Sequence, residues 1–335
     1  MRIAVTGASG NVGSAVVRAA LRSGAEVVGV VRRVPPDRAA PPGTQWVRCD
    51  IGAVDADASL RAAFTGADAV VHLAWAIQPS HDRRRLIRTN LLGTEAVIAA
   101  AEAAGVPHLV HASSVGAYSA GPKDRLVDES WPTDGIPSSS YSRDKVAAER
   151  LLDAAQNRLE TVTRVRPALV VQKRAAAELL RYFLPAIARP VARVPLPLLP
   201  LPDRTVTQVV HADDVADAVL RILAARPGGA FNLAPADSLG PDALAAAFGG
   251  RRVPLPAGLL RTAATATWTT HLQPVDVGWV DMLLGHPLLD SSRARGELGW
   301  SPLHTAADAL TDVIAGIRAN AGDRSPLLRP LRIFS

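Results

Sequence analysis

The first 170 residues alternate between short apolar runs and longer Ala-rich stretches. Continuous apolar runs rich in Val are typical of parallel strands that are covered on both faces. The helical stretches between them end near Gly24, Gly66 and Gly105, where helix C-caps belong. We expect strands at residues 2–7, 26–32, 46–50, 69–75, 108–114 and 161–171. Alternation of this kind with short links predicts an α/β fold with a doubly wound parallel sheet.

The chain changes character after residue 171. A Pro-rich stretch at 189–204 leads to a strand followed by a helix, and 229–235 reads as one more strand. The remaining residues are helical and rich in loops. We expect a larger domain of residues 1–171 plus about 205–235. A smaller, mostly helical C-terminal lobe of about 172–204 and 236–335 would bind substrate.

Composition indicates a globular protein, with 48% hydrophobic and 20% charged residues among 335. The apolar runs are too short to span a membrane, and the N-terminus lacks the pattern of a signal peptide. A cytoplasmic protein is therefore the default. The single cysteine, Cys49, excludes an internal disulfide, and the eight histidines lack metal-ligand spacing. We expect no metal.

The net charge of +6 raises the question of nucleic-acid binding. Only three residues are lysines, and the arginines are mostly scattered along the chain. Aromatic residues make up 4% of the chain, which leaves few rings for stacking on bases. We therefore expect a small-molecule substrate and no nucleic-acid or membrane partner.

Candidate chemistry begins in the turn that follows the first predicted strand. Gly7, Gly10 and Gly13 form the spacing G-x-x-G-x-x-G and open a helix. These glycines allow a tight turn, backbone approach to a pyrophosphate, and close packing of helix on strand. A helix N-terminus also favours the anionic phosphates. The loop predicts a Rossmann-type dinucleotide-binding domain, with cofactor contacts from Gly7, Ser9, Gly10, Asn11, Val12 and Gly13.

The end of the second strand bears on which dinucleotide is bound. NAD sites usually carry an acidic residue there, whereas this chain has Arg32 and Arg33. Guanidinium groups pair with a 2′-phosphate, so we expect NADP(H), with NAD(H) possible. The alternative is that both arginines are solvated loop residues. Asp50, followed by Ile51, either contacts the adenine amino group or caps a helix.

Two further segments carry candidate catalytic groups. Tyr141 and Lys145 lie one helical turn apart and point the same way, and Ser113 and Ser114 end the fifth strand. Alone, these would be ordinary helix surface and a capping pair. Further short motifs are "VVHLAW" (70–75), "NLLGT" (90–94), "RPALVV" (166–171), "HADDVADA" (211–218) and "SSRARGELGWSP" (291–302). In combination, these motifs resemble the extended short-chain dehydrogenase/reductases, the NAD(P)-dependent epimerase/dehydratase-like family, over about residues 1–302.

The resemblance implies a Ser-Tyr-Lys triad. Tyr141 would be the acid/base, and Lys145 would lower the pKa of the phenol and bond the nicotinamide ribose. Ser114 would hold the substrate oxygen, and Asn90 would support the helix or a proton path. Further cofactor contacts implied by the resemblance come from Leu73, Ala74, Trp75, Asn90, Lys145, Pro167, Ala168 and Leu169.

Departures from the family narrow the expected activity. The aliphatic strand at 166–171 lacks the Asn with which nucleotide-sugar members contact a diphosphate. Val115 and Gly116 stand where sugar dehydratases carry Asp and Glu. Both features favour an NADP(H)-dependent carbonyl reductase or alcohol dehydrogenase on a small to medium organic substrate. An NAD-retaining epimerase or dehydratase acting on a nucleotide sugar is the alternative, and a non-catalytic NADP(H) sensor is a third.

Several residues have two interpretations. Trp75, Gln78, Tyr118 and the 172–204 segment either line the substrate or pack internally, and the basic loop 81–85 either grips an anion or is solvated. We expect His211, Asp213 and Asp214 to position a strand-to-helix turn, and Trp300 to anchor packing. The resemblance also allows a homodimer through the helix after residue 94 and the Tyr141 helix.

Overall fold

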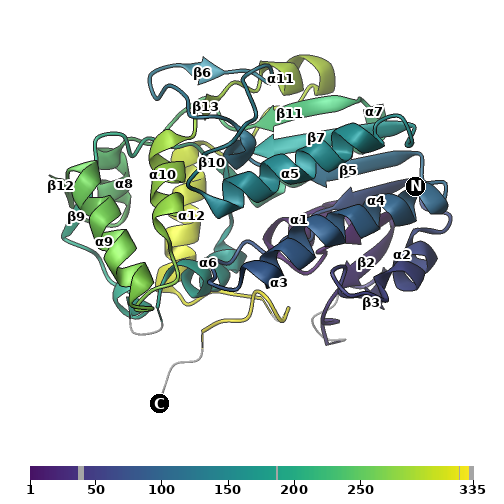
Figure 1. Ribbon diagram of the computed structural model, residues 1–335, viewed down its shortest axis with the longest axis horizontal. Helices are drawn as coiled ribbons and strands as arrows, with labels where there is room; N and C mark the ends of the chain where they lie inside the picture. Colours follow the sequence, from purple (N-terminus) through teal and green to yellow (C-terminus); the bar gives the residue numbers. More distant parts are fainter. Residues whose placement is uncertain (37–40, 186–187, 324, 332–335) are drawn as a thin grey trace.

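The central feature of the protein is one sheet of seven parallel strands, which lies behind α4 and α5 in Figure 1. The computed structural model describes residues 1–36, 41–185, 188–323 and 325–331. The strand order is β3–β2–β1–β4–β5–β7–β11, so the direction of winding reverses at β1. The strands are β1 (Arg2–Thr6), β2 (Glu26–Val31), β3 (Thr44–Arg48), β4 (Ala69–His72), β5 (His108–Ala112), β7 (Thr161–Pro167) and β11 (Gly229–Leu233). The predicted doubly wound Rossmann-type sheet is confirmed.

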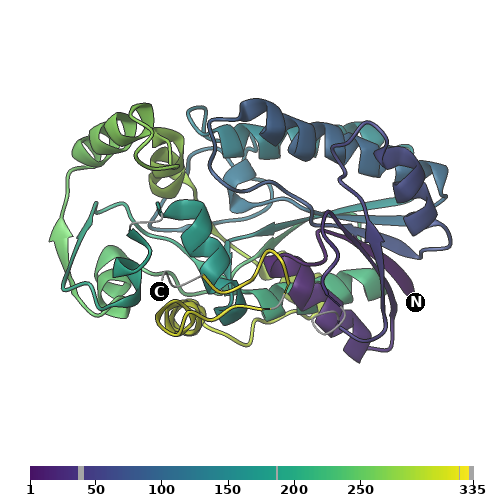
Figure 2. The same ribbon diagram turned by 90° about the horizontal axis from the view of Figure 1, so that it is seen from below.

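Helices cover both faces of the sheet, as Figure 2 shows. On one face α1 (Asn11–Arg22) packs beside α7 (Ala212–Ala225). On the other face lie α2 (Ala56–Phe64), α4 (Gly93–Ala103) and α5 (Ser140–Ala155). Each set buries Val, Leu, Ile and Ala side chains against the strands, which explains why the strand sequences are apolar on both faces.

Each of the three predicted helix-ending glycines has a positive φ. The angles are +78° at Gly24, +70° at Gly66 and +65° at Gly105. Only glycine adopts this left-handed backbone without strain. These residues turn the chain from a helix back towards the next strand.

The predicted strand at 161–171 is two strands. After Pro167 the chain leaves the main sheet, and β8 (Leu169–Val171) pairs in parallel with β10 (Val209–His211). The Ala168 N–H still donates to Leu233 O of β11, whereas the Leu169 N–H donates to Gln208 O. This change of partner turns residues 167–169 across the carboxyl edge of the sheet.

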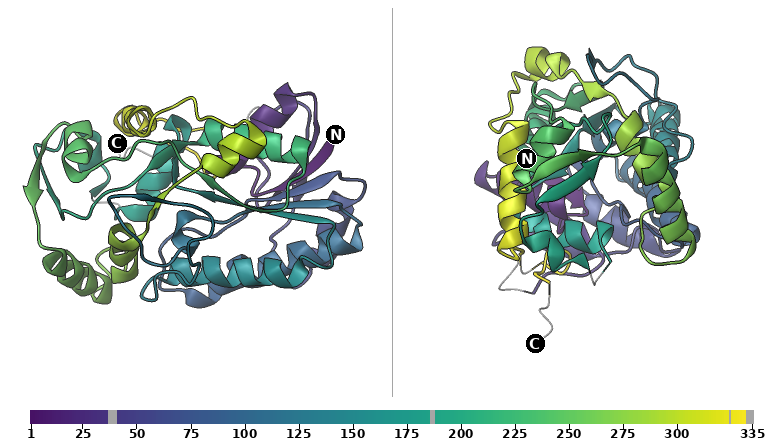
Figure 3. Two further views of the ribbon diagram at one scale, coloured as in Figure 1. Left: turned by 90° about the horizontal axis from the view of Figure 1, so that it is seen from above. Right: turned by 90° about the vertical axis from the view of Figure 1, so that its left-hand side faces the viewer.

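A second group of elements lies beyond the carboxyl ends of the strands (Figure 3). It comprises α6 (Ala176–Phe183), β9 (Leu198–Leu201), α8 (Pro241–Ala247), β12 (Arg251–Pro254), α9 (Ala257–Thr269) and α10 (Val277–Gly285). Strands β9 and β12 pair in parallel. Helix α12 (Ala306–Arg318) joins this lobe to the sheet domain, because its buried face contacts both α6 and β10.

Part of the C-terminal region packs on the sheet domain. Helix α11 (Ser292–Leu298) contacts α7 and β11, and Trp300 is fully buried in the same core. The Trp300 indole donates to Asp214 O, in agreement with the expected packing role. The exact division between the two domains stays a prediction. In the part of the chain that the structure describes, the remaining elements are α3 (Arg83–Ile87), β6 (Leu126–Val127), β13 (Leu288–Leu289), the π-helical turn η2 (Arg88–Leu92), and the 3₁₀ turns η3 (Val115–Ala117), η4 (Lys173–Ala175) and η6 (Val191–Arg193).

Among the described residues, none of the helices is both long and apolar enough to cross a membrane.

Candidate active site

The predicted cofactor residues gather along one edge of the sheet. They follow the carboxyl ends of β1, β2, β3, β4 and β7, which all point the same way because the strands are parallel. The strand order reverses at this edge, and such a switch point is where doubly wound sheets bind ligands.

The Gly-rich loop has the shape that a dinucleotide phosphate requires. Gly7 has a φ of +70°, and its N–H donates to Val30 O at 3.0 Å. A Cβ on Gly13 would lie 2.1 Å from Gly7 O, so a side chain there would separate α1 from the loop. Gly10 precedes α1 without a side-chain cap, and the first helical turn carries no acidic residue. The N–H groups of this turn therefore remain available for an anion.

Neighbouring segments hold this loop in place. A Cβ on Gly7 would lie 2.7 Å from Ala74 N, so the turns after β1 and β4 are in direct contact. The Asn11 amide donates to Val170 O at 2.9 Å and accepts from Gln172 at 3.0 Å. The Asn11 side chain thus joins α1 to β8.

The chain after the last β-strands contributes an unexpected neighbour of this loop. The buried Ser325 hydroxyl donates to Ser9 O at 2.8 Å, and Leu328 is fully buried. The Arg181 guanidinium of α6 holds the carbonyl groups of Leu327 and Arg329. The segment 325–331 is therefore fastened beside the Gly-rich loop, although nothing in its sequence predicted this.

The residues expected near the adenosine differ in their surroundings. Arg32 and Arg33 are exposed beyond the end of β2. Asp50 accepts the N–H of Gly52 at 3.2 Å, so it closes a turn, and the residue before α2 is Asp55. Ile51 is buried.

Three candidate catalytic side chains meet at the carboxyl end of β5. The Ser114 hydroxyl accepts the N–H of Gly116 at 3.0 Å and also hydrogen-bonds to Tyr141. The Ser139 hydroxyl accepts the Ser142 N–H and so begins α5, whose first turns carry Tyr141 and Lys145. Lys145 is buried, and its Nζ donates to Ala112 O at 2.7 Å.

Trp75 provides a second contact for the Lys145 ammonium. Nζ lies 3.5 Å from the centre of the Trp75 ring and 6.0 Å from that of Tyr141. A cation over the indole face is stabilised by the ring quadrupole. Trp75 was expected to contact cofactor or substrate, and in the structure its side chain covers the lysine.

Burial is the largest influence on the pKa values of Tyr141 and Lys145. It raises the pKa of Tyr141 to about 12, opposed by the Ser114 hydrogen bond. It lowers the pKa of Lys145 to about 7, opposed by Glu149 and Asp144. The direction at Tyr141 differs from the expected lowering, because desolvation of the phenolate is the largest influence on this pKa and the Lys145 ammonium is turned towards Ala112 and Trp75.

A buried polar network lies behind the triad. The Arg166 guanidinium holds both oxygens of Glu149, at 2.9 and 2.6 Å, and the Ser113 hydroxyl donates to the same carboxylate. Arg166 also donates to the Tyr118 hydroxyl, which donates to Asn232 at 2.7 Å. Tyr118 is fully buried, which favours internal packing over a place in the substrate site. Its ring belongs to the core.

Two polar side chains beside Tyr141 are also paired. The Asn90 amide, in the π-helical turn, accepts the Ala76 N–H at 2.7 Å and donates to Ala76 O at 3.3 Å. Arg83, from the basic loop, holds Asp144 through two bonds of 3.0 and 2.7 Å. This arginine therefore neutralises a buried carboxylate, while Arg84 and Arg85 are exposed.

The expected turn residues after β10 have the roles that the sequence indicated. The His211 ring accepts the Asp213 N–H at 3.2 Å and caps α7. Asp214 accepts the N–H groups of Leu303 and His304, which positions the chain before α12.

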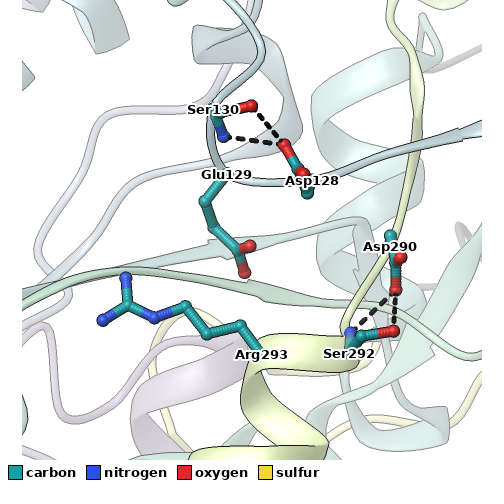
Figure 4. A pocket seen from close by; sticks show the side chains of 6 residues that line it. All are labelled: Asp128, Glu129, Ser130, Asp290, Ser292 and Arg293. Carbon is teal, nitrogen blue, oxygen red and sulfur yellow. Dashed lines mark hydrogen bonds between the residues drawn. The ribbon is translucent and has the colours of Figure 1, made fainter.

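A hollow far along the sheet edge carries several carboxylates but belongs to the scaffold (Figure 4). Asp128 and Asp290 each accept from the backbone and hydroxyl of the serine two positions later. Glu129 accepts the Asn232 N–H at 2.7 Å. Among the described residues, no three His, Cys, Asp or Glu side chains are arranged to hold a metal ion.

The fold and site together define a class of protein: a Rossmann-type dinucleotide-binding protein whose candidate Ser, Tyr and Lys side chains lie at the same sheet edge as its Gly-rich loop. A family model described as "NAD dependent epimerase/dehydratase family" matches residues 3–234. The chain belongs to this family.

The similar proteins that carry an activity in their names differ in that activity. An uncharacterised protein of Mycobacterium tuberculosis is 30% identical over 96% of this chain, which spans 31% of that protein's length. A ketoreductase of Stigmatella aurantiaca, named for a farnesylated dihydroquinoline oxide, is 30% identical over 51% of this chain and 50% of its own. A dTDP-glucose 4,6-dehydratase of Streptomyces griseus is 28% identical over 97% and 96%. The structure of Thermus thermophilus UDP-glucose 4-epimerase in complex with NAD matches with a TM-score of 0.70 at 22% identity, covering 95% of this chain and 99% of that one.

Proposed function

We propose that the protein is an NADP(H)-dependent oxidoreductase that reduces a carbonyl, or oxidises the corresponding alcohol, with Ser114, Tyr141 and Lys145. The observation that carries the proposal is the grouping of these side chains at the same sheet edge as the Gly-rich loop. Ser114 hydrogen-bonds to Tyr141, and Lys145 lies one helical turn further along α5. The relative named as a ketoreductase supports this choice.

In this mechanism the chain supplies the proton and the positioning. The nicotinamide, when bound, supplies or accepts the hydride. Tyr141 donates its phenolic proton to the substrate oxygen as the carbonyl becomes an alcohol, and takes a proton back in the reverse direction. Because burial raises the pKa of Tyr141, the phenol stays protonated until that transfer. Ser114 orients the substrate oxygen, and the Lys145 charge stabilises the phenolate.

NADP(H) preference is part of the proposal. Arg32 and Arg33 are exposed at the end of β2, where a 2′-phosphate would meet two guanidinium groups. Replacing both by Glu should raise the Kd for NADPH by about 10- to 100-fold, with a smaller change for NADH. Arg22→Glu, at the far end of α1, is the control and should change neither value. Tighter binding of NADH than NADPH by the native protein would overturn this preference.

An NAD-retaining epimerase or dehydratase acting on a nucleotide sugar is the second candidate. It is favoured by the dehydratase that aligns with nearly the whole chain. One contact disfavours the Asp-Glu pair of a sugar dehydratase at Val115 and Gly116. A Cβ on Gly116 would lie 2.8 Å from Cε1 of Tyr141, so a Glu at this position would push the tyrosine ring aside.

Incubation with NADPH and a panel of ketones and aldehydes separates the candidates. Loss of NADPH absorbance supports the reductase. Release of tightly bound NAD on denaturation, with no NADPH consumption and turnover of a nucleotide sugar, supports the second candidate. NADPH binding without either turnover would indicate a sensor. A homodimer through α4 and α5 is a further proposal, measured by light scattering.

A further inference from the structure

Two tryptophan side chains from separate segments meet the Tyr141 ring, and a phenylalanine from a third segment packs behind one of them. Trp279 of α10 lies with its ring centre 5.1 Å from that of Tyr141, and Phe183 of α6 meets Trp279 edge-on at 5.1 Å. Trp75 is edge-on to Tyr141 at 6.4 Å. We refer to Trp279, Phe183 and Trp75 as the aromatic wall. Trp279 and Trp75 flank the Tyr141 ring, and Phe183 supports Trp279 from the side.

The start of α10 is fastened to the start of α5, which fixes the position of Trp279. A Cβ on Gly278 would lie 2.4 Å from Ser138 O, so the two segments touch through their backbones. Asp276 caps α10 by accepting the Trp279 N–H at 3.2 Å. The Ser138 hydroxyl donates to Asp281 at 2.7 Å. These contacts therefore fix the position of Trp279 beside Tyr141.

A narrow hollow beside Tyr141 offers no unpaired charge to a ligand, and Trp279 is the member of the aromatic wall that lines it. Its lining includes no lysine or arginine, and its one carboxylate, Asp144, is held by both Nη atoms of Arg83. The Asn90 amide is occupied by the backbone of Ala76. The lining residues are Ala76, Ile77, Gln78, Pro79, Leu86, Asn90, Ser140, Tyr141, Asp144 and Trp279.

We infer that the substrate is an uncharged carbonyl compound whose reacting carbon adjoins an apolar ring system, and that Trp279 contacts this ring system. The inference rests on the proposed function and names its substrate class. A diphosphate beside Tyr141 and Trp279 would lose part of its hydration, and the lining of the hollow holds no cation that would replace it. A flat apolar ring, by contrast, gains both buried area and favourable ring contacts against Trp279.

A matched set of carbonyl substrates tests the class. The purified protein is incubated with NADPH and tetralone, decalone, hydroxyacetone, glyceraldehyde or UDP-glucose, and loss of NADPH absorbance is followed. We expect kcat/KM for tetralone and decalone to exceed the values for the polar carbonyls at least tenfold. Preference for the polar carbonyls or for UDP-glucose would overturn the inference and leave the cofactor chemistry intact. If no carbonyl consumes NADPH, the proposed function fails, and this inference fails with it.

Variants of the wall test the role of Trp279 separately. Trp279→Ala should lower kcat/KM for tetralone by about 10- to 100-fold and for hydroxyacetone by less than about threefold. Trp279→Phe should restore most of the loss. Trp268→Ala removes an indole from α9, where it stacks on His81, and should leave both values unchanged. An equal loss on both substrates, with unchanged circular dichroism, would contradict a contact between Trp279 and the ring system.

Discussion

The buried lysine of the triad carries a cost in stability that can be measured. Burial lowers the pKa of Lys145 from 10.5 to about 7. Between these values the unfolded chain binds more protons than the folded protein, so stability rises with pH in this interval. Below about pH 7 the full penalty is present, and above about pH 10.5 it vanishes. Lys145→Met, which keeps the length of the side chain and removes the charge, relieves it.

The size of the effect follows from the two pKa values. They give a penalty of about 5 kcal/mol at pH 6 and about 2 kcal/mol at pH 9, so the difference between variant and native stability should shrink by about 2–3 kcal/mol. The variant also leaves Ala112 O without its donor, at a cost of about 1–3 kcal/mol that does not depend on pH. The predicted quantity is therefore the change with pH, in which this constant cancels.

Urea denaturation followed by circular dichroism at several pH values measures this quantity. Lys173→Met is the matched control, because Lys173 is exposed, and its effect should be flat across the same range. A Lys145→Met effect that is also flat, or that grows with pH, would refute the reasoning. In either case the ammonium would be better solvated or better paired than the contacts with Ala112 and Trp75 indicate.

Three further changes probe the surroundings of the triad. Tyr141→Phe should lower kcat by about 10²- to 10⁴-fold while the Kd for NADPH, measured by fluorescence, stays within about twofold; retained turnover would mean that another group moves the proton. Glu149→Gln should destabilise the protein by about 3–5 kcal/mol in urea, because it leaves the Arg166 charge buried and unpaired; a loss below about 1 kcal/mol would show that the pair is solvated. Ser325→Ala should cost about 1 kcal/mol, because Ser9 O loses its donor; an unchanged urea midpoint would mean that the segment 325–331 is not held there in solution.

The parts of the site that local patterns encode could be predicted from the sequence. The Gly-rich loop could be predicted because a strand, three spaced glycines and the start of a helix all occur within the first 13 residues. The common direction of Tyr141 and Lys145 could be predicted because they lie one helical turn apart. The strands predicted at 69–75 and 108–114 are longer than the observed β4 and β5, because the sequence motifs continue beyond the last hydrogen bond of the sheet. Those additional residues form the loops that carry Trp75 and Ser114.

Contacts between distant segments could not be predicted in the same way. Tyr118 follows Ser114 closely, which suggested a place in the site, but the 3₁₀ turn η3 directs its ring into the core towards Asn232. Trp279 and Phe183 come from helices whose sequences carry no motif. Trp279 reaches Tyr141 because Gly278 lets α10 lie directly on the start of α5, and Phe183 of α6 packs against Trp279 in turn.

The cationic side chains near Tyr141 and those at the end of β2 differ in whether they are paired, and this difference bears on both the cofactor and the substrate. Arg83 and Arg166 are each held by a buried carboxylate, and the Lys145 ammonium is covered by Ala112 O and the Trp75 ring. Arg32 and Arg33, at the far end of the cofactor edge, are exposed. A net charge of +6 therefore does not predict an anionic substrate. In the proposed function, Arg32 and Arg33 would meet the 2′-phosphate of the cofactor, and Trp279 and Trp75 would lie beside the reacting carbonyl.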